Sequence, residues 1–309
     1  MTVGIKAIQG YIPETSVENI GQARRFDIGE DFLYDKIGMR LLSRKSPSED
    51  TSDLAVKAVE GLLLNSELTR EMVECIIVVT QNPDGSGLPH TSAIIHGKLG
   101  LNESCSSFDI SLGCSGFIHS LAVAKAFMEA QKMENGLVIT ADPYSKIINP
   151  NDRNTAMLFG DAACAVWIGT KPTWTTGPFD FGTASKFNDA LHIDTSGQLQ
   201  MNGREVFSFS AVSVPVSINR VLVQAGLKMD DIDMVLLHQG SRYIVDTIGK
   251  RLNVPEKTPF FATEYGNTVS SSIPLILERH VPREVKTVIA CGFGVGLTWA
   301  TTILERNEC

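Results

Sequence analysis

Short apolar runs alternate with amphipathic segments along the chain. Residues 75–80 and 234–238 are almost continuously apolar, which is typical of strands covered on both faces. Residues 54–62 and 212–218 carry apolar side chains at helical spacing, and Ser52 is a candidate N-cap for the first of these helices. The alternation predicts a layered α/β fold in which helices sandwich two related sheets.

A weak internal repeat runs through this pattern. The matched segments are 67–80 with 226–238, 98–101 with 251–254, 108–114 with 261–267, and 137–140 with 287–290. A unit of about 150 residues is too long for a solenoid, whose repeats span roughly 20–50 residues. The repeat therefore predicts duplication of a whole half, with an N-terminal half at 1–172 and a C-terminal half at 173–309.

Charge and composition narrow the class of protein. The 309 residues include 27 basic and 35 acidic side chains, a formal net charge of −8, which argues against a nucleic-acid binder. We expect no membrane span, because no apolar run reaches ~18 residues, and no signal peptide at the N-terminus. Six cysteines without a C-x-x-C pair predict reduced thiols in a cytoplasmic protein.

Cys114 is the candidate nucleophile. It ends a strand-like segment at 108–114, lies in the small-residue sequence G-C-S-G, and is followed by a long helical run at 118–128. A sulfur at a helix N-terminus meets unpaired N–H groups, which favour the thiolate over the thiol. A buried structural cysteine is the competing interpretation, and it is the one we favour for Cys75, Cys164 and Cys291 within their apolar runs.

Two further residues are candidates for proton and carbonyl chemistry. His238 ends the apolar run 234–238 and should emerge at the carboxyl edge of a central strand, where α/β sheets place their sites. Asn267 lies at the turn into a helix, and the repeat makes it the counterpart of Cys114. Each alone is more often a strand end or a helix cap, so their joint placement with Cys114 carries the hypothesis.

A glycine-rich segment stands near the C-terminus, at Gly292–Gly296. Its G-x-G-x-G spacing resembles a dinucleotide fingerprint, but the 13 residues that follow cannot form the ~30-residue βαβ unit that the fingerprint needs. The glycines instead favour close backbone approach, with N–H groups aimed at a carbonyl oxygen. A plain hairpin turn is the alternative.

Taken together, these motifs resemble the thiolase superfamily, and within it the β-ketoacyl-acyl-carrier-protein synthase III family. The resemblance covers essentially the whole chain. It rests on G-C-S-G-F at 113–117, H-Q at 238–239, Y-G-N-T at 265–268 and G-F-G-V-G-L-T-W at 292–299, together with segments 10–13, 38–40, 151–153 and 159–163. It implies the five-layer αβαβα fold with an internal pseudo-twofold duplication.

The resemblance also implies a mechanism, decarboxylative Claisen condensation of an acyl-CoA-derived group with malonyl-acyl carrier protein. Cys114 resembles the nucleophile that takes the acyl group as a thioester. His238 and Asn267 resemble the pair that binds the malonyl thioester carbonyl while CO2 leaves, both as neutral N–H donors. The backbone N–H groups of Cys114 and Val295 would hold the later oxyanion, and Phe293 resembles the aromatic gate beside the nucleophile. No cofactor and no metal are implied.

Residues expected to bind coenzyme A depart from the family pattern. Phe32 and Arg153 would clamp the adenine, with phenylalanine where many relatives carry tryptophan. Lys36 stands where an arginine often contacts the phosphates, which replaces a bidentate fork by a point charge. Arg204 and Ser241 complete the set, and Ser241 replaces an asparagine of the family's H-Q-A-N-x-R motif.

The carrier-protein patch departs as well. Tyr243 stands where the family has an arginine that commonly engages the carrier, so Arg242, Lys250 and Arg251 are the candidates that remain. Leu88 lies in the loop that in relatives reaches across a dimer to floor the acyl pocket. The resemblance therefore implies a homodimer with acyl-CoA and acyl carrier protein as partners.

Three alternatives stay open at this point. The departures leave room for a pathway-specific enzyme of the same type that moves an acyl group to another acceptor without decarboxylation. A papain-like hydrolase also has Cys, His and Asn in chain order, but the duplication and the lack of a tryptophan beside Cys114 argue against it. A non-catalytic subunit of a heterodimeric synthase would usually have lost the cysteine.

Overall fold

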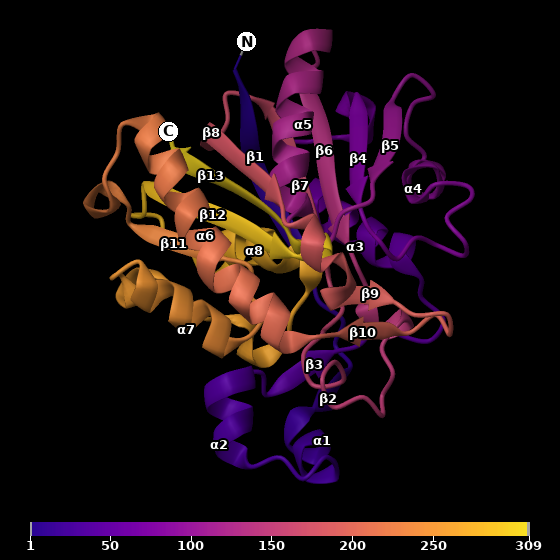
Figure 1. The fold of residues 1–309 in the computed structure, drawn as a ribbon. Helices are drawn as coiled ribbons and strands as arrows, with labels where there is room; N and C mark the ends of the chain where they lie inside the picture. Colours follow the sequence, from indigo (N-terminus) through magenta and orange to yellow (C-terminus); the bar gives the residue numbers. More distant parts are fainter. Residues whose placement is uncertain (1, 308–309) are drawn as a thin grey trace.

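The computed structural model describes residues 2–307 (Figure 1). The strands are β1 Val3–Tyr11, β2 Ser16–Glu18, β3 Leu41–Ser43, β4 Cys75–Val79, β5 Ser106–Ile110, β6 Asn135–Ala141, β7 Ala163–Thr170, β8 Trp174–Thr183, β9 Leu191–Ile193, β10 Leu199–Met201, β11 Met234–Leu237, β12 Thr287–Gly294 and β13 Thr298–Arg306. The α-helices are α1 Asn19–Arg25, α2 Glu30–Phe32, α3 Thr51–Leu64, α4 Thr91–Leu99, α5 Gly116–Gln131, α6 Gly203–Ala225, α7 Arg242–Arg251 and α8 Ser272–Arg279. Two 3₁₀ turns matter for the site, η8 Val269–Ser271 and η9 Val295–Leu297.

The strand order repeats the same plan twice. Nine strands are joined in the order β11-β12-β13-β8-β1-β7-β6-β4-β5. In the first half β4 is parallel to β6, and β6–β7 and β7–β1 are antiparallel; in the second half β11 is parallel to β12, and β12–β13 and β13–β8 are antiparallel. The internal duplication is thus present in the topology. The two halves meet where Ile5 of β1 pairs with Trp174 of β8.

Alternate side chains along the strands enter different layers, as the period of two requires. On β4, Ile77 faces the middle of the molecule, whereas Ile76 and Val78 pack under α3 and α4. On β12, Val288 faces the middle and Ile289 packs under α6 and α7. Both halves of the nine-stranded sheet are therefore covered on two faces, which explains the nearly unbroken apolar sequences of β4 and β12.

The middle layer consists of α5 and α8. Phe117, Leu121 and Met128 of α5 and Ile273 and Ile276 of α8 are fully or almost fully buried in one cluster that includes strand residues of both halves. With α3 and α4 outside one sheet and α6 and α7 outside the other (Figure 1), the layers follow the predicted order αβαβα. The turns that precede α5 and α8 come from different halves of the chain and carry Cys114 and Asn267.

Some sequence predictions about this frame are wrong. β11 lies at the edge of the sheet, not at its centre, so His238 follows an edge strand. The second-half counterpart of β5, residues 259–263, forms no strand, and Pro259 there lacks the N–H that a ladder needs. The cap of α3 is Asp50 rather than Ser52, with Asp53 completing a capping box.

Helix α6 has the length and composition of a membrane span, unlike what the absence of a long apolar run suggested. Its side chains Val214, Ile218 and Val221 are fully buried against the C-terminal sheet, as in the core helix of a globular protein, while Val212 and Val216 are exposed. The predicted boundary between 172 and 173 falls in the turn between β7 and β8. Because one sheet crosses it, the division into 1–172 and 173–309 stays a prediction.

Candidate active site

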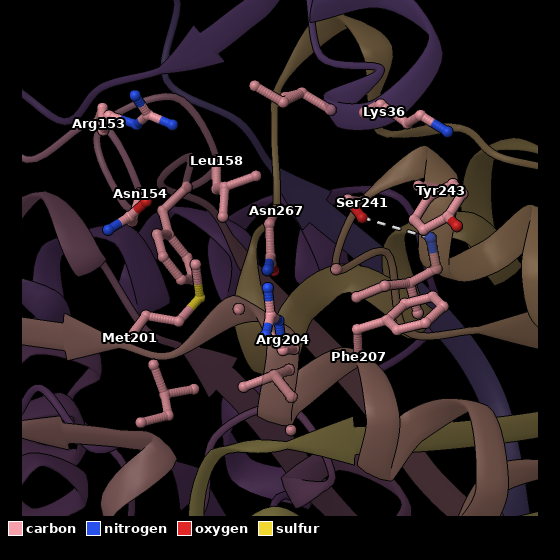
Figure 2. A pocket seen from close by; sticks show the side chains of 18 of the residues that line it. Lys36, Arg153, Asn154, Leu158, Met201, Arg204, Phe207, Ser241, Tyr243 and Asn267 are labelled. Carbon is pink, nitrogen blue, oxygen red and sulfur yellow. Dashed lines mark hydrogen bonds between the residues drawn. The ribbon is translucent and has the colours of Figure 1, made fainter. Parts of the chain in front are cut away.

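A cavity of about 720 Å³ brings the three central candidates together. Cys114, His238 and Asn267 all line it, although they come from the start of α5, the end of β11 and the turn before α8. Each is at most 4% exposed. These three side chains therefore lie at the buried end of the cavity, and Figure 2 shows Asn267 reaching into it. The sequence-based prediction that they meet is confirmed in position.

Cys114 precedes α5, whose first residue is Gly116 and whose N-cap is Ser115. The prediction of a sulfur at a helix N-terminus is therefore correct. Burial works against the predicted thiolate: it raises the pKa of the Cys114 thiol to about 12, although the backbone N–H groups of Val295 and Cys114 oppose the shift. A raised pKa favours the thiol over the thiolate, and a thiol has to lose its proton as the sulfur attacks.

The glycine-rich turn between β12 and β13 lies directly against this sulfur. The strands pair as a hairpin, with Gly294 opposite Thr298. A Cβ on Gly294 would lie 2.6 Å from the Cys114 Sγ, and one on Gly292 would lie 2.6 Å from the Cys114 carbonyl oxygen. Only glycine allows this approach, and it places the Val295 N–H toward the sulfur. The hairpin turn is therefore also the turn that carries the predicted oxyanion donor, the Val295 N–H.

Replacement of Gly294 by alanine should displace the Cys114 side chain. We expect a lower midpoint of thermal unfolding and acylation of Cys114 slowed by about tenfold or more, since small displacements of reacting groups are costly. The matched control is Gly97→Ala in α4, where a Cβ meets nothing within 4 Å and alanine favours the helix. Thermal unfolding and intact-mass kinetics measure both effects; equal behaviour of the two variants would contradict the close-packing argument.

His238 is a neutral imidazole at the inner end of the cavity. Burial lowers its pKa to about 3, and contact with the Val269 backbone opposes the shift only in part. Its Nδ1 lies 2.8 Å from the Ser272 hydroxyl, and the ring of Phe293 meets it edge-on with centroids 5.6 Å apart. When Ser272 donates to Nδ1, the single proton of the neutral ring stands on Nε2 as a hydrogen-bond donor.

The neutrality of His238 has a measurable pH signature. We expect its imidazole ¹H resonance, assigned by its loss in His238→Ala, to show no titration between about pH 5 and 8. In the unfolded chain a histidine titrates near pH 6.5. The folded pKa is lower than this. The contribution of His238 to stability is therefore complete above about pH 6.5 and falls as the pH drops from there toward the folded pKa. A midpoint near 6.5 in the folded protein would contradict the assignment.

Asn267 has a fixed amide orientation. Its Oδ1 accepts the Val269 N–H at 2.9 Å, and its backbone is held between Leu158 and Gly160 by bonds of 2.8 and 2.9 Å. Because the oxygen is occupied within the turn, the Nδ2 group is the part of the amide left for the cavity. The side chain is therefore arranged as a donor.

The outer part of the cavity carries the residues predicted to bind coenzyme A. Phe32, Lys36, Arg153, Arg204 and Ser241 all line it, and all but Ser241 are exposed. Figure 2 shows Arg153 and Lys36 on opposite sides of the opening. An opening with three basic side chains suits a polyanionic ligand.

Two of these residues have additional contacts. The Lys36 ammonium lies 3.9 Å from the ring centroid of Tyr243, which stacks on Phe207 at 5.1 Å. Ser241 is the N-cap of α7 and accepts the Ile244 N–H at 3.4 Å. Lys36 is thereby held at the opening by an aromatic pair from the second half. Ser241 lines the cavity and also caps α7.

Comparison with known proteins gives the family. The 3-oxoacyl-[acyl-carrier-protein] synthase III family matches residues 108–185, and its C-terminal domain matches residues 222–306. The β-ketoacyl-[acyl-carrier-protein] synthase III of Lactococcus lactis subsp. lactis is 34% identical over 97% of this chain and 98% of its own length. The chain belongs to the 3-oxoacyl-acyl-carrier-protein synthase III family.

Other members of the synthase III family agree over the full length. Synthase III 1 of Bacillus anthracis is 32% identical with complete coverage of both chains. The crystal structure of the Thermus thermophilus enzyme superposes with a TM-score of 0.91 at 33% identity and covers 99% of this chain and all of that one. The predicted family, the thiolase-like fold and the class of acyl-transferring condensing enzyme are confirmed.

The synthase III carrier patch predicted on α7 is only partly available. Arg251 donates to the Ala211 carbonyl of α6 at 2.6 Å, and the Arg242 guanidinium lies over the Phe260 ring at 4.7 Å. Lys250 is exposed. Arg242 and Arg251 are thus engaged within the chain, and the assignment of Arg242, Lys250 and Arg251 to carrier binding stays a prediction.

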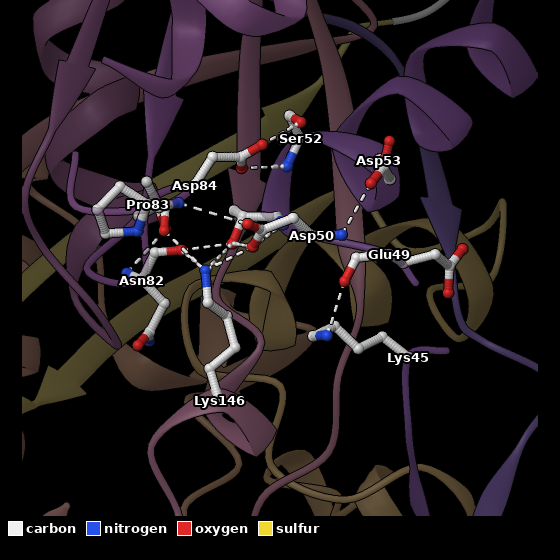
Figure 3. A network of polar contacts seen from close by, with 12 residues as sticks. Lys45, Glu49, Asp50, Ser52, Asp53, Asn82, Pro83, Asp84 and Lys146 are labelled. Carbon is white, nitrogen blue, oxygen red and sulfur yellow. Dashed lines mark hydrogen bonds and ion pairs between the residues drawn. The ribbon is translucent and has the colours of Figure 1, made fainter. Parts of the chain in front are cut away.

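Leu88 does not line the cavity of its own chain. It is 91% exposed on the segment between β4 and α4. The base of this segment is fixed: Lys146 Nζ donates to the Pro83 carbonyl at 2.7 Å, and the Ser52 N–H donates to Asp84 at 2.8 Å (Figure 3). The segment thus has a fixed base and an exposed tip at Leu88. Leu88 could contribute to an acyl pocket only in a second copy of the chain, so this role stays a prediction.

The sequence analysis missed several residues of the site. Ser272 on His238 and the cavity-lining Met201 and Phe207 were not singled out. The polar run 268–272 before the apolar start of α8 was the available signal for Ser272, since such runs mark helix N-termini. Nothing local to Met201 or Phe207 indicates a cavity. Within residues 2–307, no cluster of three or more His, Cys, Asp and Glu side chains suited to a metal is found.

Proposed function

We propose that this synthase III transfers an acyl group from acyl-CoA to Cys114 and condenses it with malonyl-acyl carrier protein. The observation that carries the proposal is that two neutral donors, His238 and Asn267, share one cavity with a buried thiol. Neutral donors suit a charge that exists only during the reaction, because they stabilise it without a permanent cation.

The first half-reaction forms the acyl-enzyme. The Cys114 sulfur attacks the thioester carbonyl. The tetrahedral oxyanion then accepts hydrogen bonds from the backbone N–H groups of Cys114 and Val295. The C–S bond to coenzyme A then breaks, and the thiol proton of Cys114 ends on the departing CoA sulfur. Charge and protons balance without a separate base, which fits the raised pKa of Cys114.

The second half-reaction makes the carbon–carbon bond. The malonyl thioester carbonyl accepts hydrogen bonds from His238 and Asn267; loss of CO2 leaves its electron pair as an enolate at this oxygen. The enolate carbon attacks the acyl-Cys114 carbonyl, and the C–S bond breaks to release the 3-oxoacyl carrier and the Cys114 thiolate, which takes up one proton from solvent to regenerate the thiol. Phe293, packed edge-on against His238, is placed as an apolar wall beside the carboxylate that leaves.

The test is identification of the product. The enzyme is incubated with acetyl-CoA and malonyl-acyl carrier protein, and the carrier product and CO2 are followed by mass spectrometry and isotope release. We expect 3-oxobutanoyl carrier and one CO2 per product. An acetyl ester or amide with no CO2 would overturn the proposal in favour of transfer to another acceptor, and a product formed equally by Cys114→Ala would exclude the acyl-enzyme.

We further propose a homodimer that pairs along β5. This strand lies at the edge of the nine-stranded sheet, and Phe108 and Ile110 on it are only partly buried. An unpaired edge is a template for a second strand, and pairing there would also bring Leu88 of another copy near the acyl site. We expect light scattering to give about twice the 33.6 kDa chain mass; a single-chain mass at micromolar concentration would contradict it. The cytoplasmic location and a reaction without cofactor stay predictions.

A further inference from the structure

A buried carboxyl lies behind the site and takes no part in the proposed chemistry. Asp142 follows β6 and is fully buried. Its Oδ1 accepts the Gln81 N–H at 2.7 Å and the Thr80 hydroxyl at 3.3 Å, and its Oδ2 accepts the Ser270 hydroxyl at 2.7 Å. Burial raises the pKa of Asp142 to about 7 against these bonds. A carboxyl this costly to bury joins the first half of the chain to a turn of the second.

The turn that it joins has an unfavourable backbone. Val269, beside Ser270, has a φ of +51°. A β-branched residue in the left-handed region is a genuine outlier, and such strain persists only where surrounding contacts determine it. A second bond from the same strand end supports the turn, since the hydroxyls of Thr140 and Ser271 lie 2.8 Å apart. The carboxyl end of β6 therefore holds η8 through Ser270 and Ser271.

The same turn orients the two donors of the site. The Val269 N–H binds the Asn267 Oδ1 at 2.9 Å, and Ser272, directly after the turn, contacts His238 Nδ1 at 2.8 Å. If the turn relaxed at Val269, its N–H would leave the Asn267 oxygen and the amide would be free to rotate. Cys114 packs in one apolar cluster with Val269, but its backbone belongs to the start of α5 and not to this turn.

We propose that Asp142 and Ser270 are positioning residues for decarboxylation: their hydrogen bond holds the strained turn that aims Asn267 and His238 at the malonyl carbonyl. The inference rests on the proposed function, in which these two donors act in the second half-reaction. It predicts a larger effect on decarboxylation than on acylation, because the hydrogen bonds of the turn reach the two donors, whereas Cys114 meets the turn only through apolar packing with Val269.

The test separates the two half-reactions in four variants. Ser270→Ala removes the hydroxyl, and Asp142→Ala removes the carboxyl; in Asp142→Asn the amide can accept from Gln81 and donate to Ser270, so it retains the clamp. The matched control is Ser217→Ala, which removes a hydroxyl bonded to buried Asp180, also at 2.7 Å, between α6 and β8. Acylation is measured by intact mass with acetyl-CoA, and decarboxylation by CO2 release from malonyl-acyl carrier protein, with kcat and KM determined separately.

We expect Ser270→Ala and Asp142→Ala to lower the kcat of decarboxylation about ten- to hundredfold. This loss should not exceed the loss in Asn267→Ala, which removes a donor itself. KM and the acylation rate should stay within about threefold, as should all rates of Asp142→Asn and Ser217→Ala. If Asp142→Ala fails to fold, Ser270→Ala alone decides.

Several results would overturn the inference. A parental decarboxylation rate in Ser270→Ala would do so, and so would an equal loss of the acylation rate in that variant. The inference also fails if Ser217→Ala loses as much decarboxylation as Ser270→Ala, or if Asp142→Asn loses as much as Asp142→Ala. Asn267→Ala is measured in parallel. If Asn267→Ala decarboxylates normally, the proposed role of the donors has failed; if it loses activity and Ser270→Ala does not, only the positioning inference has failed.

Discussion

Replacement of Cys114 by alanine is expected to abolish the acyl-enzyme. Of the five described cysteines, all of them buried, only Cys114 lines the cavity, and only its sulfur has the Val295 N–H directed toward it. Without the sulfur, no covalent step remains that could hold the acyl group. Intact mass after incubation with acetyl-CoA should therefore show one added acetyl group on the parent and none on the variant.

The control for this result is Cys75→Ala. Cys75 is equally buried, in β4, and does not line the cavity, so the variant should acylate like the parent. An adduct that persists on Cys114→Ala, located by peptide mapping on another residue, would remove the basis of the proposed function. A folded variant is confirmed by its thermal unfolding, because loss of one buried sulfur should change stability only moderately.

Asn267→Ala and His238→Ala are expected to lose malonyl decarboxylation while still accepting the acyl group. Each removes one donor to the developing enolate, and loss of a single such donor typically costs 10²–10³ in rate. Acylation uses the backbone N–H groups of Cys114 and Val295 and requires neither side chain. CO2 release and intact mass, measured on the same samples, give the two rates.

His96→Ala is the matched control for the histidine variant. His96 is in α4 and contacts the Asn102 carbonyl away from the cavity, so both half-reactions should remain at the parental level. If either Asn267→Ala or His238→Ala decarboxylates as fast as the parent, that residue is not a donor to the malonyl carbonyl. If acylation is lost as well, the separation of the two donor sets is wrong.

Local sequence patterns predicted much of this molecule. The unbroken apolar character of 75–79 follows from burial on both faces, and the G-C-S-G turn places Cys114 before α5 because small residues let the chain pass between strand and helix. The repeat paired Cys114 with Asn267, and two such turns do reach one cavity. These features depend on neighbours in the sequence, so the sequence reveals them.

What the sequence did not predict depends on distant contacts. The pKa of Cys114 is raised mainly because other elements bury the thiol, an effect that acts against the helix N-terminus predicted from the local motif. The edge position of β11 depends on whether 259–263 forms a neighbouring strand. The bond between Asp142 and Ser270 spans 128 residues, and no spacing rule connects such positions.

The middle layer has a consequence for how the molecule comes apart. α5 and α8 share one apolar cluster with strands of both halves, so neither sheet keeps its inner cover when the other is lost. Melting should accordingly be a single cooperative event, with no intermediate in which one repeat survives alone. The cavity that joins Cys114 of one half to Asn267 and His238 of the other would then form and be lost in the same transition. A chain with only one half folded would have no activity.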